Sequence, residues 1–211
     1  MAEKQAAAKG PDWDTRYRAG GGALFGTAPN EYLRMSLARG RFRPATALCL
    51  ADGDGRNGRW LAKRGLAVTA VDISKVATEQ AHASDTKSGN AVERIVADLR
   101  DWQPEPGQTW DLVCLIYLQG PPALRRKAVE TGLKALAPGG LLVLEGFAGT
   151  PDADAPLGPD DADKRFEPGD VPPLPADVTL LEETRGLVRL DEGERHAGMA
   201  RVLRLTARRA A

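Results

Sequence analysis

The eight residues ADGDGRNG, at 51–58, decide the fold class of this chain. They carry the spacing G-x-G-x-x-G at Gly53, Gly55 and Gly58, and they follow a short apolar run, ATALCLA, at 45–51. An apolar run of this length before a glycine-rich turn is typical of a buried parallel strand. Glycines let the backbone come close to a ligand, and a following helix offers it free N–H groups. The stretch therefore predicts a strand–loop–helix unit that binds a ligand.

The rest of the chain repeats this alternation of strands and helices. A helix at 56–64 ends at Gly65, and Ser74 is suited to cap another helix. Two long strands, at 178–190 and 198–209, would close the sheet as an antiparallel pair. The predicted fold class is α/β: a doubly wound, mostly parallel seven-stranded sheet with helices on both faces and a final antiparallel strand. The remaining predicted elements are strands at 66–74, 94–99, 110–118 and 141–147, a helix at 121–137 and a tight turn at 138–140.

Composition divides the chain into a tail, one domain and a loop. Residues 1–11 are rich in Ala and Lys and are expected to be a disordered tail, whereas 12–211 are expected to form a single domain. Trp13 and Tyr17 lie four apart, on one face of a predicted helix. Pro, Asp and Gly dominate 149–177, and a loop of this length is either a lid over a site or a solvated insertion.

Charge and cysteine usage disfavour several classes of protein. Lys+Arg and Asp+Glu each number 29, so the formal net charge is zero and a nucleic-acid partner is disfavoured. No run of about 20 apolar residues predicts a membrane span, and the N-terminus lacks the apolar region of a signal peptide, so a cytoplasmic protein is expected. Cys49 and Cys114 each lie in an apolar run and are expected to be buried, reduced thiols; a disulfide would require their strands to be neighbours. No Cys/His cluster has the spacing of metal ligands.

Acidic residues indicate which ligand the glycine loop holds. Asp52 and Asp54 flank Gly53 and would repel a pyrophosphate, whereas a ligand bearing an ammonium and a sulfonium would be attracted. Asp72 ends the second predicted strand, where a carboxylate can accept both hydroxyls of a ribose. Asp98 ends the third, where it can accept a hydrogen bond from an adenine amino group. Asp52 and Asp54 favour a sulfonium nucleoside over a nicotinamide dinucleotide, whereas Asp72 fits either cofactor.

Five motifs in order resemble a known family. ADGDGRNG, VTAVDIS, VADL, WDLVCLIY and LAPGGLLVLE are similar to the successive motifs of class I S-adenosylmethionine-dependent methyltransferases. WDTRY, LFGTAPNEYL and LCLADGDGRN resemble, more narrowly, the small tellurite-resistance and thiopurine-type methyltransferases. The resemblance spans nearly the whole chain from Trp13. It implies a Rossmann-like methyltransferase fold, S-adenosylmethionine as cofactor and a small-molecule methyl acceptor.

Three departures from the family pattern stand at the site. Cys49 occupies a strand position that is commonly acidic, and Ala51 one that is commonly glycine. The fourth-strand segment ends in Gln119-Gly120-Pro121, where the family often has His-Leu-Pro. Ala51 keeps a small residue, which remains compatible with cofactor binding, whereas no catalytic or substrate role is transferred to Gln119.

The candidate site residues follow from these motifs and from the resemblance. Trp13 and Tyr17 are placed by the resemblance over the sulfonium, although a helix packing its aromatic residues into the core would look the same. Tyr117 and His196 are weak candidates for a catalytic role; a core tyrosine and an exposed turn histidine are the alternatives. The predicted cofactor residues are Trp13, Tyr17, Asp52, Gly53, Asp54, Gly55, Asn57, Asp72, Ile73, Asp98, Leu99 and Leu115.

The predicted activity is in-line methyl transfer from S-adenosylmethionine to a soft nucleophile, such as a thiol or a metalloid oxyanion, on a small molecule. Such a nucleophile needs alignment more than acid or base help, and no catalytic triad or metal site is evident. The alternatives are a protein that binds S-adenosylmethionine without catalysis and an NAD-dependent reductase. We expect no nucleic-acid or membrane partner, and a monomer or homodimer.

Overall fold

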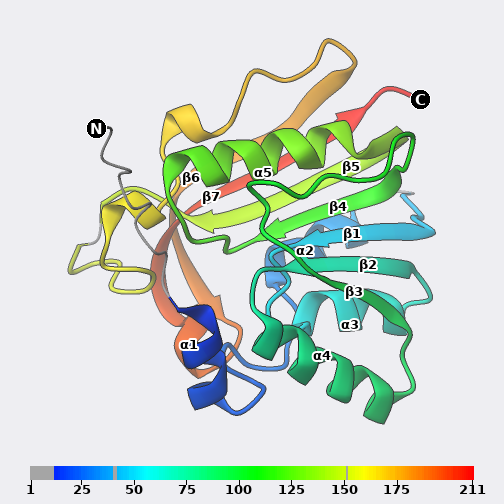
Figure 1. Cartoon of the computed structure of the whole chain (residues 1–211). Coiled ribbons are helices and arrows are strands. Elements are labelled where there is room, and N and C mark those ends of the chain that lie inside the picture. The colour runs from blue at the N-terminus through cyan, green and yellow to red at the C-terminus, as the bar shows by residue number, and fades with distance from the viewer. Residues whose placement is uncertain (1–11, 40–41, 151) are drawn as a thin grey trace, which may run out of the picture.

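A computed structural model describes residues 12–39, 42–150 and 152–211, and it shows one seven-stranded sheet of order β3-β2-β1-β4-β5-β7-β6 (Figure 1). The strands β1 to β5 pair in parallel, and β7 runs antiparallel to both β5 and β6. The predicted fold class is confirmed, whereas the predicted tail at 1–11 lies outside the described residues. The strands are β1 (Thr46–Leu50), β2 (Ala67–Asp72), β3 (Val92–Val96), β4 (Trp110–Ile116), β5 (Leu136–Phe147), β6 (Val178–Asp191) and β7 (Ala197–Arg209).

Helices cover both faces of the sheet, as predicted (Figure 1). Side chains close their first turns: Ser74 accepts from the amide of Ala77 at the start of α4, and Asn30 does so from that of Leu33 at the start of α2. The helices are α1 (Trp13–Gly20), α2 (Glu31–Ala38), α3 (Arg56–Lys63), α4 (Lys75–Ser88) and α5 (Pro122–Lys134), with short 3-10 turns η1 (Ala162–Lys164), η2 (Pro168–Asp170) and η3 (Glu194–His196).

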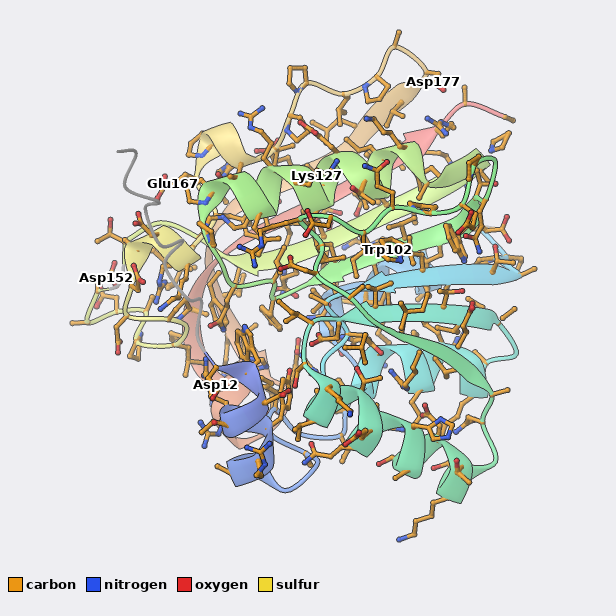
Figure 2. The ribbon with its side chains drawn as sticks, in the orientation of Figure 1. Asp12, Trp102, Lys127, Asp152, Glu167 and Asp177 are labelled. Atoms are coloured by element: carbon orange, nitrogen blue, oxygen red, sulfur yellow. The ribbon has the colours of Figure 1, made fainter. Side chains whose placement is uncertain are left out.

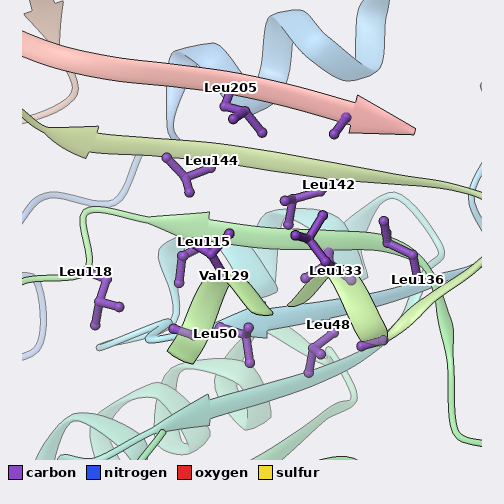
Figure 3. Close-up of a cluster of buried hydrophobic side chains, with 14 of the residues drawn as sticks. Leu48, Leu50, Leu115, Leu118, Val129, Leu133, Leu136, Leu142, Leu144 and Leu205 are labelled. Atoms are coloured by element: carbon purple, nitrogen blue, oxygen red, sulfur yellow. The ribbon is translucent and has the colours of Figure 1, made fainter. Parts of the chain in front are cut away.

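The core has two main layers because the parallel strands are apolar on both sides. On one face, leucines of β1, β4, β5 and β7 meet Val129 and Leu133 of α5 (Figure 3). Trp102, labelled in Figure 2, packs against the same cluster from the loop after β3. On the other face, Tyr32 and Leu33 of α2 and Leu61 of α3 pack on alternate residues of the same strands. The central parallel strands are thereby buried between helices, which leaves their ends as the places where a ligand can reach them.

Strand boundaries differ from prediction at two places. β5 begins at Leu136, so the predicted tight turn at 138–140 lies inside it; the register of β4 and β5 shifts between Trp110 and Leu112 to accommodate those residues. β3 covers Val92–Val96 rather than 94–99, because the chain turns at Asp98, whose carbonyl accepts from the amide of Trp102. Asp98 consequently stands on a loop beyond the strand end.

The described residues of the loop at 149–177 are anchored to the domain. Arg125 of α5 is fully buried and donates to the carboxylate of Asp170, at 2.7 Å from its Nε. Arg165 is also fully buried, and its guanidinium donates to the carbonyls of Leu157 and Pro159. Figure 2 shows Asp152 on the outer part of this segment and Glu167 beside α5. A plain solvated insertion is therefore the wrong description.

Cys49 and Cys114 are register partners on β1 and β4, and both are buried free thiols, as predicted. Contact with Cys114 and burial raise the pKa of Cys49 well above its usual value. Within the described ranges, every helix falls short of the length and apolarity that crossing a membrane requires. The same residues include no group of three or more His, Cys, Asp or Glu able to hold a metal ion.

Candidate active site

A cavity of about 230 Å³ opens where the loops after β1, β2, β3 and β4 meet. β1 lies at the point where the strand order reverses, between β2 and β4, which is where doubly wound sheets bind ligands. Both catalytic candidates, Tyr117 and His196, line the cavity. The predicted cofactor residues that line it are Trp13, Tyr17, Asp52, Gly53, Asp54, Asn57, Asp72, Ile73, Asp98 and Leu99.

Two predicted cofactor residues stand elsewhere. Leu115 packs in the core beneath α5, because alternation along β4 turns the next residue, Ile116, toward the cavity instead. Gly55 precedes α3 with a φ of 85°, and a Cβ atom there would lie 2.2 Å from Nη2 of Arg94. Gly55 is thus required for packing behind the loop. Neither Gly55 nor Leu115 lines the cavity, and their predicted contact with the cofactor stays a prediction.

Two other residues of the cavity wall adopt left-handed backbone without being glycine. Ala51 has a φ of 57° and Tyr117 a φ of 54°, and they follow β1 and β4. Each such conformation costs about 1–2 kcal/mol for an L-residue, and strain of this kind clusters at functional sites. Ala51 adopts this conformation at the position where the resembled family commonly has glycine.

Asp54 and Asp72 supply carboxylates that no described cation neutralises. Oδ2 of Asp54 accepts from the amide of Leu24 at 2.9 Å, and the oxygens of Asp72 accept from the amides of Gly53 at 2.7 Å and Ser74 at 2.8 Å. Neither forms an ion pair with any residue that the structure describes. Burial raises the pKa of each to about 6. Desolvated carboxylates on a cavity wall fit a ligand that brings its own positive charge.

Asp52 plays a different part from the one predicted, although it touches the cavity. Its Oδ2 pairs with Nη1 of Arg94 at 3.1 Å, and its Oδ1 accepts from the amide of Gly58 at 3.1 Å. Arg94 also binds Asp85, which binds Arg59 in turn, so the four side chains form a buried chain of alternating charge. The charge of Asp52 is therefore compensated inside the fold and is not available to a cationic ligand.

The loop after β3 forms the far end of the cavity with Ile73. Leu99 is buried, whereas Ile73 is 49% exposed at the mouth. The carboxylate of Asp98 accepts from the backbone amide of Arg100 and from its Nε, both at 2.9 Å. That pairing lowers the pKa of Asp98, so an anionic acceptor faces this end at neutral pH. This arrangement fits the predicted contact with an adenine amino group.

Aromatic rings line the opposite end. The rings of Trp13 and Tyr17 lie 6.0 Å apart between centroids, and Tyr17 meets Phe25 edge to face at 6.2 Å. Phe25 stacks on the imidazole of His196 at 5.0 Å with 10° between the planes. Tyr117 approaches the same imidazole at 4.5 Å. We call Phe25, Tyr117 and His196 the aromatic wall.

His196 and Tyr117 are poor proton acceptors. Burial, and then the nearby Arg56 guanidinium, lower the pKa of His196 to about 3. Burial and the carboxylates of Glu145 and Glu192 raise the pKa of Tyr117 well above its usual value. Both side chains are therefore neutral at neutral pH, and neither is suited to remove a proton there.

Sequence reasoning missed the polar residues behind the aromatic wall. Asn30, Glu145 and Glu192 are buried, lie on separate elements and are joined through the side-chain amide of Asn30. No local motif marks them, since Glu145 and Glu192 lie 115 and 162 positions from Asn30 along the chain. Asn57 accepts from the amide of Asn30 at 2.8 Å, which favours its structural role over a contact with the cofactor.

The lid hypothesis for 149–177 finds no support in the cavity. Its lining residues come from the segments before α2, from the loops after β1 to β4, from α3, α5 and η3, and none comes from the described part of 149–177. By contrast, α1 and the residues after it contribute Trp13, Tyr17 and Phe25 to the lining.

Comparisons with known proteins agree with this geometry. A family model described as a methyltransferase domain matches residues 47–140. TehB from Haemophilus influenzae is 15% identical with a TM-score of 0.66, over 85% of this chain and 61% of TehB. The N-methyltransferase NodS from Bradyrhizobium japonicum WM9 is 18% identical with a TM-score of 0.60, over 94% of this chain and 99% of NodS. A structure from a study of the conversion of a disulfide bond into a thioacetal group during echinomycin biosynthesis is 19% identical with a TM-score of 0.66, over 94% of this chain and 90% of the other. No curated protein matches this chain.

The methyltransferase-domain match over residues 47–140 and the fold shared with S-adenosylmethionine-dependent methyltransferases confirm the predicted resemblance to class I S-adenosylmethionine-dependent methyltransferases. The cofactor of this class is S-adenosylmethionine, as predicted. At identities of 14–19%, the likeness to structures such as TehB and NodS establishes the fold and leaves the methyl acceptor open.

Proposed function

We propose that this chain transfers the methyl group of S-adenosylmethionine to a soft nucleophile, such as a thiol or a metalloid oxyanion, of a small molecule. The observation that carries the proposal is that one cavity joins a carboxylate-rich half to an aromatic half. Asp54 and Asp72 bring negative charge without a cation of their own, which fits a cofactor that carries an ammonium and a sulfonium. The aromatic wall stands where an acceptor would approach.

The shape and the charge of the cavity wall both fit S-adenosylmethionine. Gly53 passes so close to Tyr17 that a Cβ atom would leave only 2.2 Å to the tyrosine hydroxyl, so the loop contributes bare backbone to the wall. In this proposal Asp72 accepts the ribose hydroxyls and Asp98 accepts from the adenine amino group, and both residues line the cavity. When bound, the cofactor supplies an activated methyl group with a neutral leaving group. Trp13 and Tyr17 offer aromatic faces to the sulfonium, worth about 0.5–2 kcal/mol for a good contact.

The lack of a proton acceptor in the aromatic wall favours a soft nucleophile. His196 and Tyr117 stay neutral at neutral pH, so the chain's own part is to orient the acceptor and to exclude water. Thiols and metalloid oxyanions are nucleophilic at neutral pH without a strong base, whereas an alcohol is not. The similar structure linked to thioacetal formation concerns sulfur chemistry, in agreement with this choice.

The test is a two-stage assay on the purified chain. Calorimetry with S-adenosylhomocysteine checks the cofactor half, and a radiolabelled-methyl screen over thiols, selenite, tellurite, alcohols and amines checks the acceptor half. We expect binding of S-adenosylhomocysteine but not of NAD, and label transfer to thiols or oxyanions only. Binding without transfer to any of these would favour the non-catalytic alternative. Preferential transfer to alcohols would contradict the soft-nucleophile proposal.

A further inference from the structure

A chain of buried polar groups runs behind the aromatic wall. Arg204 pairs with Glu145 at 2.9 Å, and the amide nitrogen of Asn30 donates to Glu145 at 2.6 Å and to Glu192 at 2.9 Å. Glu192 in turn pairs with Nη2 of Arg56 at 2.9 Å. Asn30 thus joins two ion pairs, and because the cluster holds two carboxylates and two guanidiniums, its charges balance. It links β5, β7, α3 and the turn between β6 and β7.

Glu192 is the hub of this cluster. Its side chain is 1% exposed, and Oε1 accepts from Asn30 and from the backbone amide of Glu31 at 3.0 Å, while Oε2 is left to Arg56. Its own amide donates to the carbonyl of His196 at 3.0 Å, and the amide of His196 donates to Gly193 at 2.8 Å. The same short turn therefore sets both the carboxylate that holds Arg56 and the imidazole that faces the cavity.

Arg56 faces one particular atom of that imidazole. Its Nη2 lies 3.5 Å from Nδ1 of His196, and its guanidinium also donates to the carbonyl of Ala28 at 3.0 Å and to Glu192. A guanidinium carries only donors and does not lose its proton in proteins. A proton on Nδ1 would therefore point at an N–H group of a cation. The proton of the neutral ring must reside on Nε2, which has no partner among the residues that the structure describes.

We propose that Glu192 is a positioning residue that, through Arg56, holds His196 as the neutral tautomer protonated at Nε2, so that His196 presents the methyl acceptor with a permanent hydrogen-bond donor. This inference rests on the proposed function, because the acceptor is assumed to approach the aromatic wall. The rings of Phe25 and Tyr117 enclose the imidazole and keep its plane in place.

A fixed donor restricts the acceptor chemically. The substrate must turn a lone pair of a neighbouring oxygen or nitrogen, or of the nucleophile itself, toward Nε2. A group that can only donate would leave two donors facing each other in a buried site, and such mismatches discriminate strongly between analogues. The inferred substrate class is therefore a soft nucleophile that carries a hydrogen-bond acceptor beside the reacting atom.

The tautomer can be read directly by nitrogen NMR. The chain has two histidines, His82 and His196, so a His82→Gln variant assigns the signals of His196 without ambiguity. At pH 7 we expect the Nδ1 signal of His196 at an unprotonated position and the Nε2 signal at a protonated one. A protonated Nδ1 in the wild-type protein would overturn the inference.

Glu192→Gln tests the positioning role and replaces only one carboxylate oxygen of this side chain by an NH₂ group. The amide oxygen can keep the contacts with Asn30 and Glu31, but its NH₂ group then faces Arg56, donor against donor. We expect a mixture of both His196 tautomers, a rise of roughly tenfold in KM for the acceptor and less than a twofold change in Kd for S-adenosylhomocysteine. Glu192→Asp, which keeps the charge, should restore part of the tautomer preference. Asp191→Asn makes the same chemical change on the exposed neighbouring residue and should alter neither quantity.

The outcomes separate this inference from the proposed function. An active wild-type enzyme in which Glu192→Gln leaves both the tautomer and the acceptor KM unchanged would overturn the role of Glu192 alone. A wild-type protein that shows the expected tautomer but transfers no methyl group would contradict the proposed function, and with it the donor role of His196. A melting curve of each variant, compared with wild type, identifies any loss of fold.

Discussion

The hydroxyl of Tyr17 lies 2.2 Å from the position that a Cβ atom on Gly53 would occupy. α1 is thereby seated directly on the glycine loop, with no room for a side chain between them. The contact joins the first described helix to the loop after β1, two segments that the sequence separates by more than 30 positions. The N-terminal segment is thus part of the cavity wall rather than an appendage to the sheet.

Gly53→Ala tests this contact. The residue has a φ of 56°, so alanine adds backbone strain of about 1–2 kcal/mol and also pushes Tyr17 away. We expect at least a tenfold loss of affinity for S-adenosylhomocysteine, measured by calorimetry. Gly139→Ala is the matched control, since its φ is 74° with nothing within 4 Å of the new atom, and it should lower stability without changing affinity. Equal affinity losses in both variants would mean that backbone strain alone, and not the contact between Tyr17 and Gly53, lowers the affinity.

Cofactor binding should depend on pH through Asp54 and Asp72. Burial raises the pKa of each to about 6, above the value in an unfolded chain. From about pH 4 to 6 the folded protein therefore holds protons that the unfolded chain has released, and its stability falls as pH rises. A cationic ligand needs the ionised form, so affinity should rise from pH 5 to pH 7 and then level off. Calorimetry at several pH values measures this, and Asp54→Asn should make the rise smaller, because Asp72 still titrates over the same range. An affinity that falls over the same range would contradict the assignment.

Arg94→Met should destabilise the fold strongly. Asp52 and Asp85 would lose their shared partner while buried, and breaking a buried pair on one side costs about 3–5 kcal/mol. Urea unfolding gives the free energy directly. Arg34→Met removes an exposed pair with Glu31 and should cost less than about 1 kcal/mol. If both variants lost the same small amount of unfolding free energy, Arg94 would not be supporting the glycine loop.

Ligand binding should leave the segment 152–177 as open to proteases as before. None of these residues lines the cavity, and the buried pair of Asp170 with Arg125 of α5 already holds the segment to the domain. Limited proteolysis with and without S-adenosylhomocysteine would show cleavage there at equal rates, with protection appearing around Trp13–Gly20 instead. Selective protection of 152–177 would revive the lid hypothesis.

Much of the fold was readable in the sequence because its signals are local. The apolar run before ADGDGRNG, the capping Ser74 and the aromatic spacing of Trp13 and Tyr17 each reflect contacts within a few residues. The order of these signals suffices to predict a parallel sheet with its ligand at the strand ends. The placement of Asp54, Asp72 and Asp98 around one cavity follows from the same rule, because carboxyl ends of parallel strands share an edge.

Tertiary structure decided what each acid does. Asp52 and Asp54 look alike in sequence, two positions apart, yet Arg94 on β3 neutralises the first and leaves the second to the cavity. Likewise Glu192 acquires its role only because folding brings Asn30 and Arg56 to it from 162 and 136 positions away. Charge compensation depends on which groups share a desolvated space, and that neighbourhood exists only once the chain has closed.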